Sequence, residues 1–190
     1  MHSPASFIVR IVIVAAVVAA VSLAPKWSSR WLPAAPSRAG VAPPQGPSIQ
    51  GPSVSGRVRV LDGDSIDLAG EPIRLFGIDA PESRQVCRDG AGRAYRCGHA
   101  ATLALTAATA GRTVACTRVE HDRYDRQVAI CTADGRDLGD TMVRAGHAVE
   151  LSEYSGGRYA AAEREARAAR RGLWAGSFEQ PSEWRHRRAR

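Results

Sequence analysis

The chain has 190 residues and a formal net charge of +7, which is enough for one compact core with terminal extensions but too short for two large domains. Most of the excess charge lies at the ends, because residues 55–178 carry 18 arginines and 17 acidic residues whereas residues 1–54 carry four basic residues and no acid. A near-neutral central region argues against a protein that holds polyanions by bulk charge neutralisation alone.

The N-terminal end has the features of an export signal. Residues 11–24 are an uninterrupted apolar run preceded by Arg10, with no acidic residue upstream. The run is shorter than the roughly 20 residues of a typical membrane span and suits a signal peptide, but counting back to Phe7 lengthens it to 18 residues. Pro25 directly follows the candidate cleavage site and disfavours cleavage. We therefore expect residues 1–24 to be an uncleaved membrane anchor, with a cleaved signal peptide and secretion as the alternative; either places the remainder outside the cytoplasm.

Residues 25–53 are predicted to form a semi-extended linker. They contain seven prolines among alanine, glycine and serine, and they lack the apolar periodicity of a core segment. Trp27 and Trp31 lie just beyond the apolar run, where aromatic rings favour the membrane interface. This placement supports an anchor, although two incidental tryptophans explain it nearly as well.

Residues 54–178 have the pattern of one α+β domain, and residues 179–190 form a basic tail. Alternating apolar residues predict strands, and Asp62-Gly63 predicts a two-residue type I′ turn between the first two. Helices are predicted where apolar residues recur at helical spacing ahead of a glycine. The predicted strands are residues 56–61, 65–68, 73–78, 114–119 and 127–132, and the predicted helices are residues 99–110, 138–145 and 158–171.

Charged residues cluster around the predicted third strand. Arg74, Asp79 and Glu82 follow one another closely at the end of an apolar stretch, where side chains can converge on a ligand. Asp64 lies in the preceding hairpin and Arg126 in the turn between the last two strands. Two acids for a hard cation, one acid as a base and two guanidinium groups match the requirements of phosphodiester hydrolysis. Taken singly, Asp64 is also explained as an ordinary turn residue and Arg126 as a solvated arginine.

The spacing of Arg74 and Asp79 requires an irregularity in the predicted strand if both side chains are to reach one site. Arg74 and Asp79 are five residues apart, so in a regular strand their side chains would face opposite sides of the sheet. Gly77 lies between them, and a glycine inside a strand often marks a bulge. We therefore expect a bulge or strand end near Gly77 that brings the two side chains together.

The domain contains an even number of cysteines: Cys87, Cys97, Cys116 and Cys131. Export makes disulfides their expected state, and three pairings are possible. Cys116 and Cys131 lie on opposite arms of the hairpin centred near Tyr124, so a cross-strand bond is geometrically reasonable and leaves Cys87 to pair with Cys97. A zinc site at Cys87, Cys97 and His99 is the weaker alternative, because the sequence has no closely spaced cysteine pair.

Three charged segments, residues 61–65, 73–82 and 122–126, occur in an order that resembles the staphylococcal nuclease (thermonuclease) family. The resemblance covers roughly residues 54–178 and includes the closing Gly172-Leu173-Trp174. It implies a five-stranded OB-type β-barrel with about three helices, a fold whose exposed face commonly binds nucleic acid.

The resemblance also assigns roles to individual positions. It implies a Ca²⁺ site with ligands at Asp64, Asp79 and the backbone carbonyl of Ala80. It implies Glu82 as the general base, and the phosphate-binding arginines fall on Arg74 and Arg126. Ala80 stands where the best-known member has threonine, but the backbone carbonyl is retained.

Two further positions in the resemblance bear on substrate binding. Tyr124 and Tyr154 are candidates to stack on a base or bond a phosphate, as tyrosines of the family do, while packing in the core is the favoured alternative for either one. Asp125 stands where a glycine usually precedes the second arginine, and it is expected to pair with Arg126 and to hold part of its charge away from phosphate.

The resemblance therefore implies a Ca²⁺-dependent nuclease that cuts DNA and/or RNA with little sequence preference. The alternative is a non-catalytic nucleic-acid or protein-binding module on the same barrel, or a membrane-anchored surface adaptor. All five charged positions of the family are present, which favours the enzyme. The expected partners are the nucleic-acid substrate and, through the N-terminal segment, the membrane; no obligate protein partner is indicated.

Overall fold

The computed structural model describes residues 51–122, 124 and 126–189. The predicted anchor at residues 1–24 and the linker up to residue 50 lie outside the described residues, as does Asp125. Within the described ranges, no helix is both long enough and apolar enough to cross a membrane.

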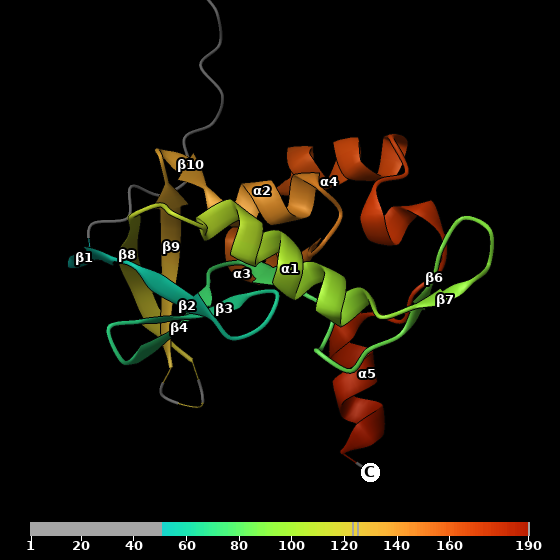
Figure 1. The fold of residues 1–190 in the computed structure, drawn as a ribbon, viewed down its shortest axis with the longest axis horizontal. Helices are drawn as coiled ribbons and strands as arrows, with labels where there is room; N and C mark the ends of the chain where they lie inside the picture. The colour runs from blue at the N-terminus through green and yellow to red at the C-terminus, as the bar shows by residue number, and fades with distance from the viewer. Residues whose placement is uncertain (1–50, 123, 125, 190) are drawn as a thin grey trace, which may run out of the picture. The chain divides into compact units, whose positions relative to one another are not determined.

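The centre of the domain is a curled sheet with the strand order β1-β8-β9-β4-β3-β2, to which β10 adds by pairing with β9 (Figure 1). All neighbours pair antiparallel except β4 and β9, which are parallel. Its strands are β1 (Ser53–Gly56), β2 (Val58–Val60), β3 (Ser65–Leu68), β4 (Glu71–Leu75), β8 (Val114–His121), β9 (Gln127–Ala133) and β10 (Arg136–Asp137). β1 and β2 are consecutive in the chain yet lie at opposite ends of this order, so the sheet curls until its two ends approach each other. The result is a half-barrel of the OB type.

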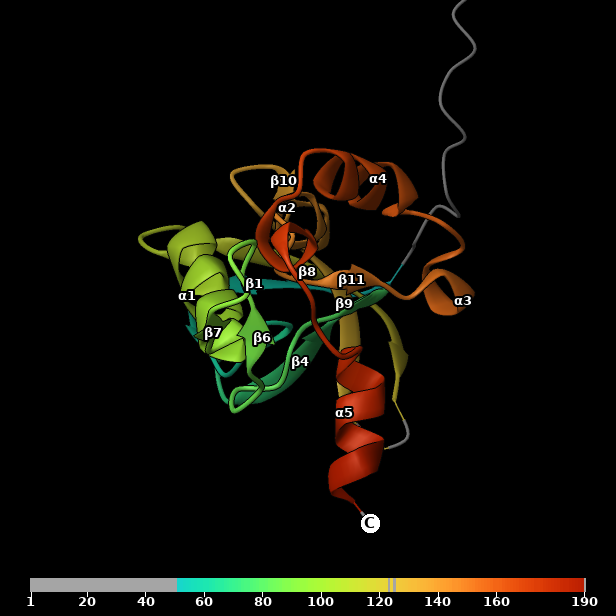
Figure 2. The same cartoon turned by 90° about the vertical axis from the view of Figure 1, so that its right-hand side faces the viewer.

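Short strand pairs and helices complete the domain. Two two-stranded sheets are formed by β5 (Ile78–Asp79) with β11 (Val149–Glu150) and by β6 (Cys87–Arg88) with β7 (Ala94–Tyr95). The helices are α1 (Cys97–Thr109), α2 (Leu138–Arg144), α3 (Ser152–Ser155), α4 (Ala160–Ala168), the 3-10 helix η1 (Gly172–Ala175) and α5 (Pro181–Arg188). Figure 2 shows α5 at the opposite end of the view from α2 and α4. The sequence predicted α1, α2 and α4 with somewhat different limits; it did not predict α3, or α5 within the basic tail.

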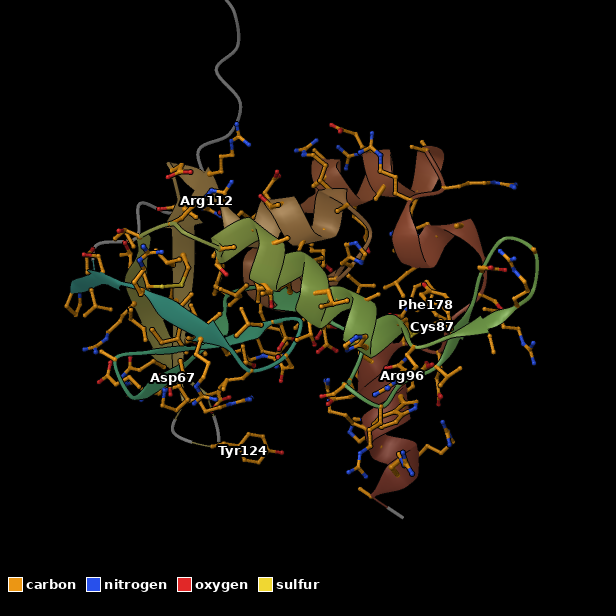
Figure 3. All side chains as sticks on the ribbon, in the orientation of Figure 1. Asp67, Cys87, Arg96, Arg112, Tyr124 and Phe178 are labelled. Carbon is orange, nitrogen blue, oxygen red and sulfur yellow. A yellow bond between two sulfur atoms is a disulfide. The ribbon has the colours of Figure 1, made fainter. Side chains whose placement is uncertain are left out.

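Apolar side chains from the sheet and the helices meet in one core. Strand residues Ile66, Ile73 and Leu75 pack there with Leu105 of α1 and with Tyr159, which precedes α4, and each is at most 2% exposed. A smaller cluster joins Cys87, Cys97, Val149 and Leu173, with Phe178 packed against it (Figure 3). The second cluster ties the segment leading to α5 to the region around β6.

The connection between β2 and β3 differs from the predicted two-residue turn. Four residues separate the strands, and the backbone N–H groups of Leu61 and Asp62 both donate to the carbonyl of Ser65, at 2.9 and 3.3 Å. The Asp62 carboxylate accepts from the backbone N–H of Asp64 at 3.1 Å. This local hydrogen bond stabilises a wider loop than a type I′ turn, so the predicted turn type was wrong.

Both expected disulfides are present. Cys116 and Cys131 are direct partners in the β8–β9 register, and Cys87 is bonded to Cys97. All four cysteines are consumed in these bonds, so the alternative of a zinc–thiolate site is excluded.

Candidate active site

A break within the predicted strand at residues 73–78 brings the side chains of Arg74 and Asp79 together. β4 ends at Leu75 and β5 begins at Ile78, and Gly77 between them has φ +69°. A Cβ at Gly77 would lie 2.7 Å from that of Ser155, so the position needs glycine for space as well as for its backbone angle. Across this break Nη2 of Arg74 donates to Oδ1 of Asp79 at 2.8 Å. The predicted interruption near Gly77 is therefore confirmed.

Two buried aspartates share the guanidinium of Arg74. Asp64 is 3% and Asp79 1% exposed, and Nη1 of Arg74 donates to Oδ1 of Asp64 at 3.0 Å. The backbone N–H of Ala80 donates to Oδ2 of Asp64 at 2.9 Å, and the Ser65 hydroxyl donates to Oδ1 at 3.0 Å. Burial raises the pKa of Asp64 to about 7, and the neighbouring Arg74 opposes this shift. For Arg74, burial acts to lower its pKa, but the two carboxylates outweigh burial and raise it.

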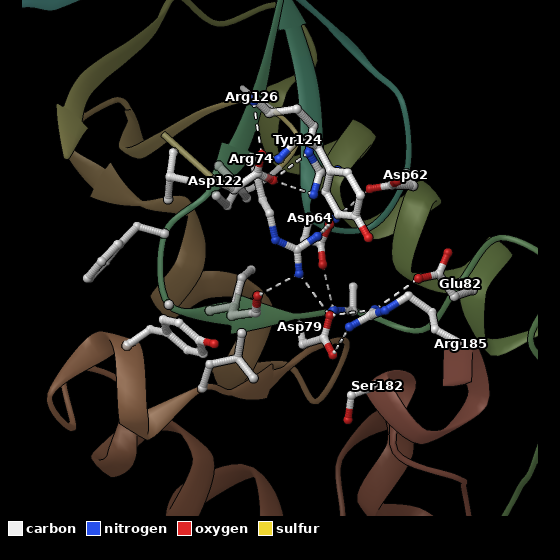
Figure 4. Close-up of a pocket in the computed structure, with 18 of the residues that line it drawn as sticks. Asp62, Asp64, Arg74, Asp79, Glu82, Asp122, Tyr124, Arg126, Ser182 and Arg185 are labelled. Atoms are coloured by element: carbon white, nitrogen blue, oxygen red, sulfur yellow. Dashed lines mark hydrogen bonds and ion pairs between the residues drawn. The ribbon is translucent and has the colours of Figure 1, made fainter. Parts of the chain in front are cut away.

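A second guanidinium reaches these carboxylates from the C-terminal helix. Arg185 on α5 donates from Nη1 to Oδ1 of Asp79 and to Oε1 of Glu82, both at 2.9 Å, and from Nη2 to Oδ2 of Asp79 at 3.0 Å (Figure 4). Burial acts to lower the pKa of Arg185, but its hydrogen bonds to Asp79 and Glu82 raise it above the ordinary value. The guanidinium group of Arg185 thus bridges Glu82 and Asp79.

Arg126 reaches the same pocket from the far hairpin. Its guanidinium donates from Nε to Oδ2 of Asp122 at 2.7 Å, and Asp122 also accepts from the backbone N–H groups of Tyr124 and Arg126. Burial acts to raise the pKa of Asp122, but these hydrogen bonds outweigh burial and lower it. An ion pair with Asp122 therefore holds Arg126. Asp125 lies outside the described residues.

The two candidate tyrosines line the pocket but are not part of the core. Tyr124 is 66% and Tyr154 65% exposed. Tyr124 projects from the tip of the β8–β9 hairpin (Figure 3), and the Arg126 guanidinium lies 5.6 Å from its ring centroid. The favoured alternative of core packing was wrong for both, because Tyr124 lies in a turn and Tyr154 in a short helix at the surface, and neither lies in a buried strand.

All predicted charged residues line one cavity of about 780 Å³. Asp64, Asp79 and Glu82 lie on one part of its wall and Arg126 on another (Figure 4). The carboxylate and carbonyl oxygens of Asp64, Asp79 and Ala80 are hard donors of the kind that Ca²⁺ prefers, so the donor chemistry fits such an ion. Within the described residues, however, no group of three or more His, Cys, Asp or Glu side chains is arranged to hold a metal.

Sequence reasoning missed two residues that shape this cavity. Asp122 stands four residues before Arg126, a spacing that often pairs charges, and this signal was available. Arg185 had a weaker signal: Pro181 and Glu183 mark a helix start, but nothing in the pattern places that helix against residues about 100 positions earlier. Contacts of that sequence separation become visible only in the fold.

The fold and the cavity define a small OB-type protein with carboxylates and guanidinium groups converging at a broken strand. The sequence model of the family described as staphylococcal nuclease homologue matches residues 72–176. The chain belongs to this family, as the resemblance predicted. The match contains Arg74, Asp79, Glu82 and Arg126, whereas Asp64 precedes it and α5 follows it.

Curated relatives support the assignment. The chain is 40% identical over 123 residues to succinoglycan biosynthesis protein ExoI of Rhizobium meliloti (strain 1021), with 64% of each chain covered, so it spans less than two thirds of that relative. It is 36% identical over 143 residues to an uncharacterized endonuclease of Escherichia coli O157:H7, covering 71% of this chain and 87% of the relative. It is 34% identical over 115 residues to probable staphylococcal-like nuclease CAN2 of Oryza sativa subsp. japonica, covering 60% and 28%.

Proposed function

We propose that the protein is a metal-dependent endonuclease that hydrolyses phosphodiester bonds of DNA or RNA with little sequence preference. The observation that carries this proposal is the convergence of Arg74, Asp64, Asp79 and Glu82 in one cavity that Arg126 also lines. Membership of the nuclease family and the endonuclease names of several relatives support the same reaction class.

The arginines serve to bind and orient the scissile phosphate. Guanidinium groups form paired hydrogen bonds with phosphate oxygens, and they stabilise the charge that grows there in the transition state. Arg74 is oriented by the two aspartates and Arg126 by Asp122. Because both arginines are held by carboxylates before substrate arrives, little side-chain entropy is lost when phosphate binds.

Glu82 serves as the general base. Its side chain is 32% exposed, so water reaches it directly, and it lies at the edge of the same cavity. In this role its carboxylate takes the proton from the water that attacks phosphorus. The backbone N–H of Glu82 donates to Oε1 of Gln85 at 3.2 Å, which helps to fix the loop that carries it.

A Ca²⁺ ion would be held by Asp64, Asp79 and the carbonyl of Ala80, and when bound it would neutralise part of the phosphate charge. Tyr124 and Tyr154 would stack on bases of the substrate, because exposed aromatic rings stack on any base. This kind of contact suits an enzyme with little sequence preference.

We also propose that the domain works outside the cytoplasm, anchored by residues 1–24 or secreted after their removal. The two disulfides support this, since such bonds persist mainly in oxidising compartments.

The test is a cleavage assay of the full-length protein on plasmid DNA and on RNA, with Ca²⁺ and with excess chelator. We expect cleavage of at least one substrate with Ca²⁺ and none with chelator. Tight binding of either nucleic acid without cleavage under any divalent ion would instead indicate the non-catalytic binding module.

A further inference from the structure

The C-terminal helix lies beyond the family match yet contributes three residues to the lining of the cavity. The match ends at residue 176, and α5 spans Pro181–Arg188. Ser182, Arg185 and His186 of this helix line the same cavity as the predicted site residues. The helix therefore lies outside the matched residues and lines the cavity that holds the candidate site.

The position of Arg185 overlaps the place of a bound cation. Its Nη1 atom lies 2.9 Å from both Asp79 Oδ1 and Glu82 Oε1, so one nitrogen bridges the two carboxylates. Its Nη2 atom lies 3.0 Å from Oδ2, and Nη2 of Arg74 lies 2.8 Å from Oδ1, so both oxygens of Asp79 accept from guanidinium groups. Ca²⁺ needs oxygens at about 2.3–2.6 Å. An ion on Asp79 and the Arg185 fork would therefore fill nearly the same volume with like charge.

The attachment of α5 is suited to release. Among the residues of the helix only Pro181 is buried, and Arg185 is 40% exposed. The same N-terminal end of the segment is held by Gln85, whose amide donates to the carbonyl of Glu179 at 2.7 Å. Arg187 pairs with Glu179, and Arg188 lies over the ring of Trp184, so these contacts stay within the segment. The helix can therefore move about its N-terminal end while exposing little apolar surface.

We infer that Arg185 is a built-in counter-ion that competes with a divalent cation for Asp79, so that α5 restrains the site until the cation displaces it. This inference rests on the proposed metal-dependent function. It differs from a role for Arg185 as a third phosphate-binding arginine, because competition requires that loss of its charge strengthens cation binding.

The test is a calorimetric titration of the full-length protein with Ca²⁺ alone, in the wild type, in Arg185→Gln and in Arg188→Gln. Arg188 lies three residues further along the same helix and contacts Trp184, so it is the matched control. We expect Arg185→Gln to lower the Kd for Ca²⁺ by about tenfold or more, within the usual range for coupled sites, and Arg188→Gln to leave it within about twofold. An unchanged or higher Kd in Arg185→Gln would overturn the inference.

Removal of Arg185 leaves Asp79 with one guanidinium partner, which can destabilise the metal-free protein. Arg185→Lys keeps the charge but loses the fork, and we expect its Kd to fall between those of the wild type and Arg185→Gln. The rise in Tm on adding Ca²⁺ gives a second measure of affinity, and a smaller rise in Arg185→Gln than in the wild type would contradict the inference.

Cleavage at sub-saturating Ca²⁺ separates the two proposals. We expect Arg185→Gln to cut plasmid faster than the wild type under this condition. If Arg185→Gln binds Ca²⁺ more tightly but no variant cuts nucleic acid, the competition is supported and the nuclease assignment fails. If no variant binds Ca²⁺ at millimolar concentration, the inference is wrong.

Discussion

The three carboxylates assigned to the candidate site, those of Asp64, Asp79 and Glu82, have different surroundings, and this difference separates their roles. Asp64 and Asp79 are almost fully buried and pair with Arg74, whereas Glu82 is 32% exposed and pairs with Arg185. A buried, paired carboxylate is a fixed ligand, while an exposed one can exchange a proton with water. Glu82 is thus the carboxylate best placed to act as a base.

Glu82→Gln tests this role directly. The amide is similar in size but cannot take a proton, so we expect turnover to fall roughly 10²–10⁴-fold, the usual contribution of a general base. Binding of Ca²⁺ should persist, because Asp64, Asp79 and Ala80 are unchanged. Steady-state cleavage and calorimetry of the purified variant check both expectations, and turnover near that of the wild type would remove Glu82 from the mechanism.

Arg126→Lys tests the second arginine. Lysine keeps the charge but loses the planar fork that Asp122 orients and that phosphate would receive, so we expect activity to fall on the order of 10²-fold. Arg59→Lys is the control, since Arg59 pairs with Asp67 outside the cavity. Equal activity in the two variants would show that Arg126 does not contact the reacting phosphate.

The contacts of single residues were predictable where the partners lie close together in the sequence. Gly77 signalled the break that joins Arg74 to Asp79, because a glycine within an apolar strand commonly marks a bulge or a bend. Exposure was harder to predict, as Tyr154 shows: it lies on a four-residue helix whose orientation depends on β11 and β5. The position of Arg185 in the cavity could not be predicted, because a basic terminal helix is normally solvated.

At the scale of elements, the start of α1 fixes the loop that carries Glu82. A Cβ built on Gly98 would lie only 1.7 Å from the carbonyl oxygen of Glu82 and 3.0 Å from Cα of Ser83. The helix and the loop therefore pack backbone to backbone, and Cys97 joins this contact to β6 through its disulfide.

Gly98→Ala should damage catalysis although alanine favours helices. The added methyl group must push the Glu82 loop away, and a displacement near 1 Å is enough to cost roughly 10²-fold in rate. Thr106→Ala, on the exposed part of the same helix, controls for changes in helix propensity. Cleavage rates and thermal unfolding of both variants check this, and a fully active Gly98→Ala would mean that the loop tolerates movement.

The Cys116–Cys131 bond joins the two longest strands and is almost fully buried. Changing both residues to serine should lower the free energy of unfolding by about 2–4 kcal/mol, typical for a native bridge. Denaturant unfolding of the double variant, compared with the wild type with and without reductant, measures the loss. A difference below the error of the fit would contradict the expected contribution.

The limits of the main elements followed from apolar periodicity, but their connections did not. β8 and β9 continue beyond the predicted strands because cross-strand pairing extends to His121 and Ala133. The Asp62-Gly63 pair predicts a tight turn, whereas the side chain of Asp62 stabilises a wider loop. Side-chain capping of this kind competes with turn preferences and is decided by the fold.

At the scale of the whole molecule, stability should fall in mild acid through His147. Burial lowers the pKa of this imidazole below its ordinary value of 6.5. As pH falls, the unfolded chain therefore takes up this proton before the folded protein does. The contribution of the neutral His147 to the free energy of unfolding is fully present above about pH 6.5 and is lost as pH falls towards the folded-state pKa. We expect His147→Gln to lose less Tm between pH 7.5 and 5 than the wild type, with exposed His99→Gln as the control. An identical pH dependence in both variants would contradict this.

One eight-residue stretch, residues 53–60, supplies β1 to one end of the curled sheet and β2 to the other. Arg57 joins the two strands, so this stretch of chain connects the two ends of the sheet. A fragment that began after Val60 would leave β8 and β3 with unpaired backbone edges, and such edges recruit strands from other chains. The same fragment would retain every charged residue of the cavity, so self-association rather than loss of the site would decide its behaviour in solution.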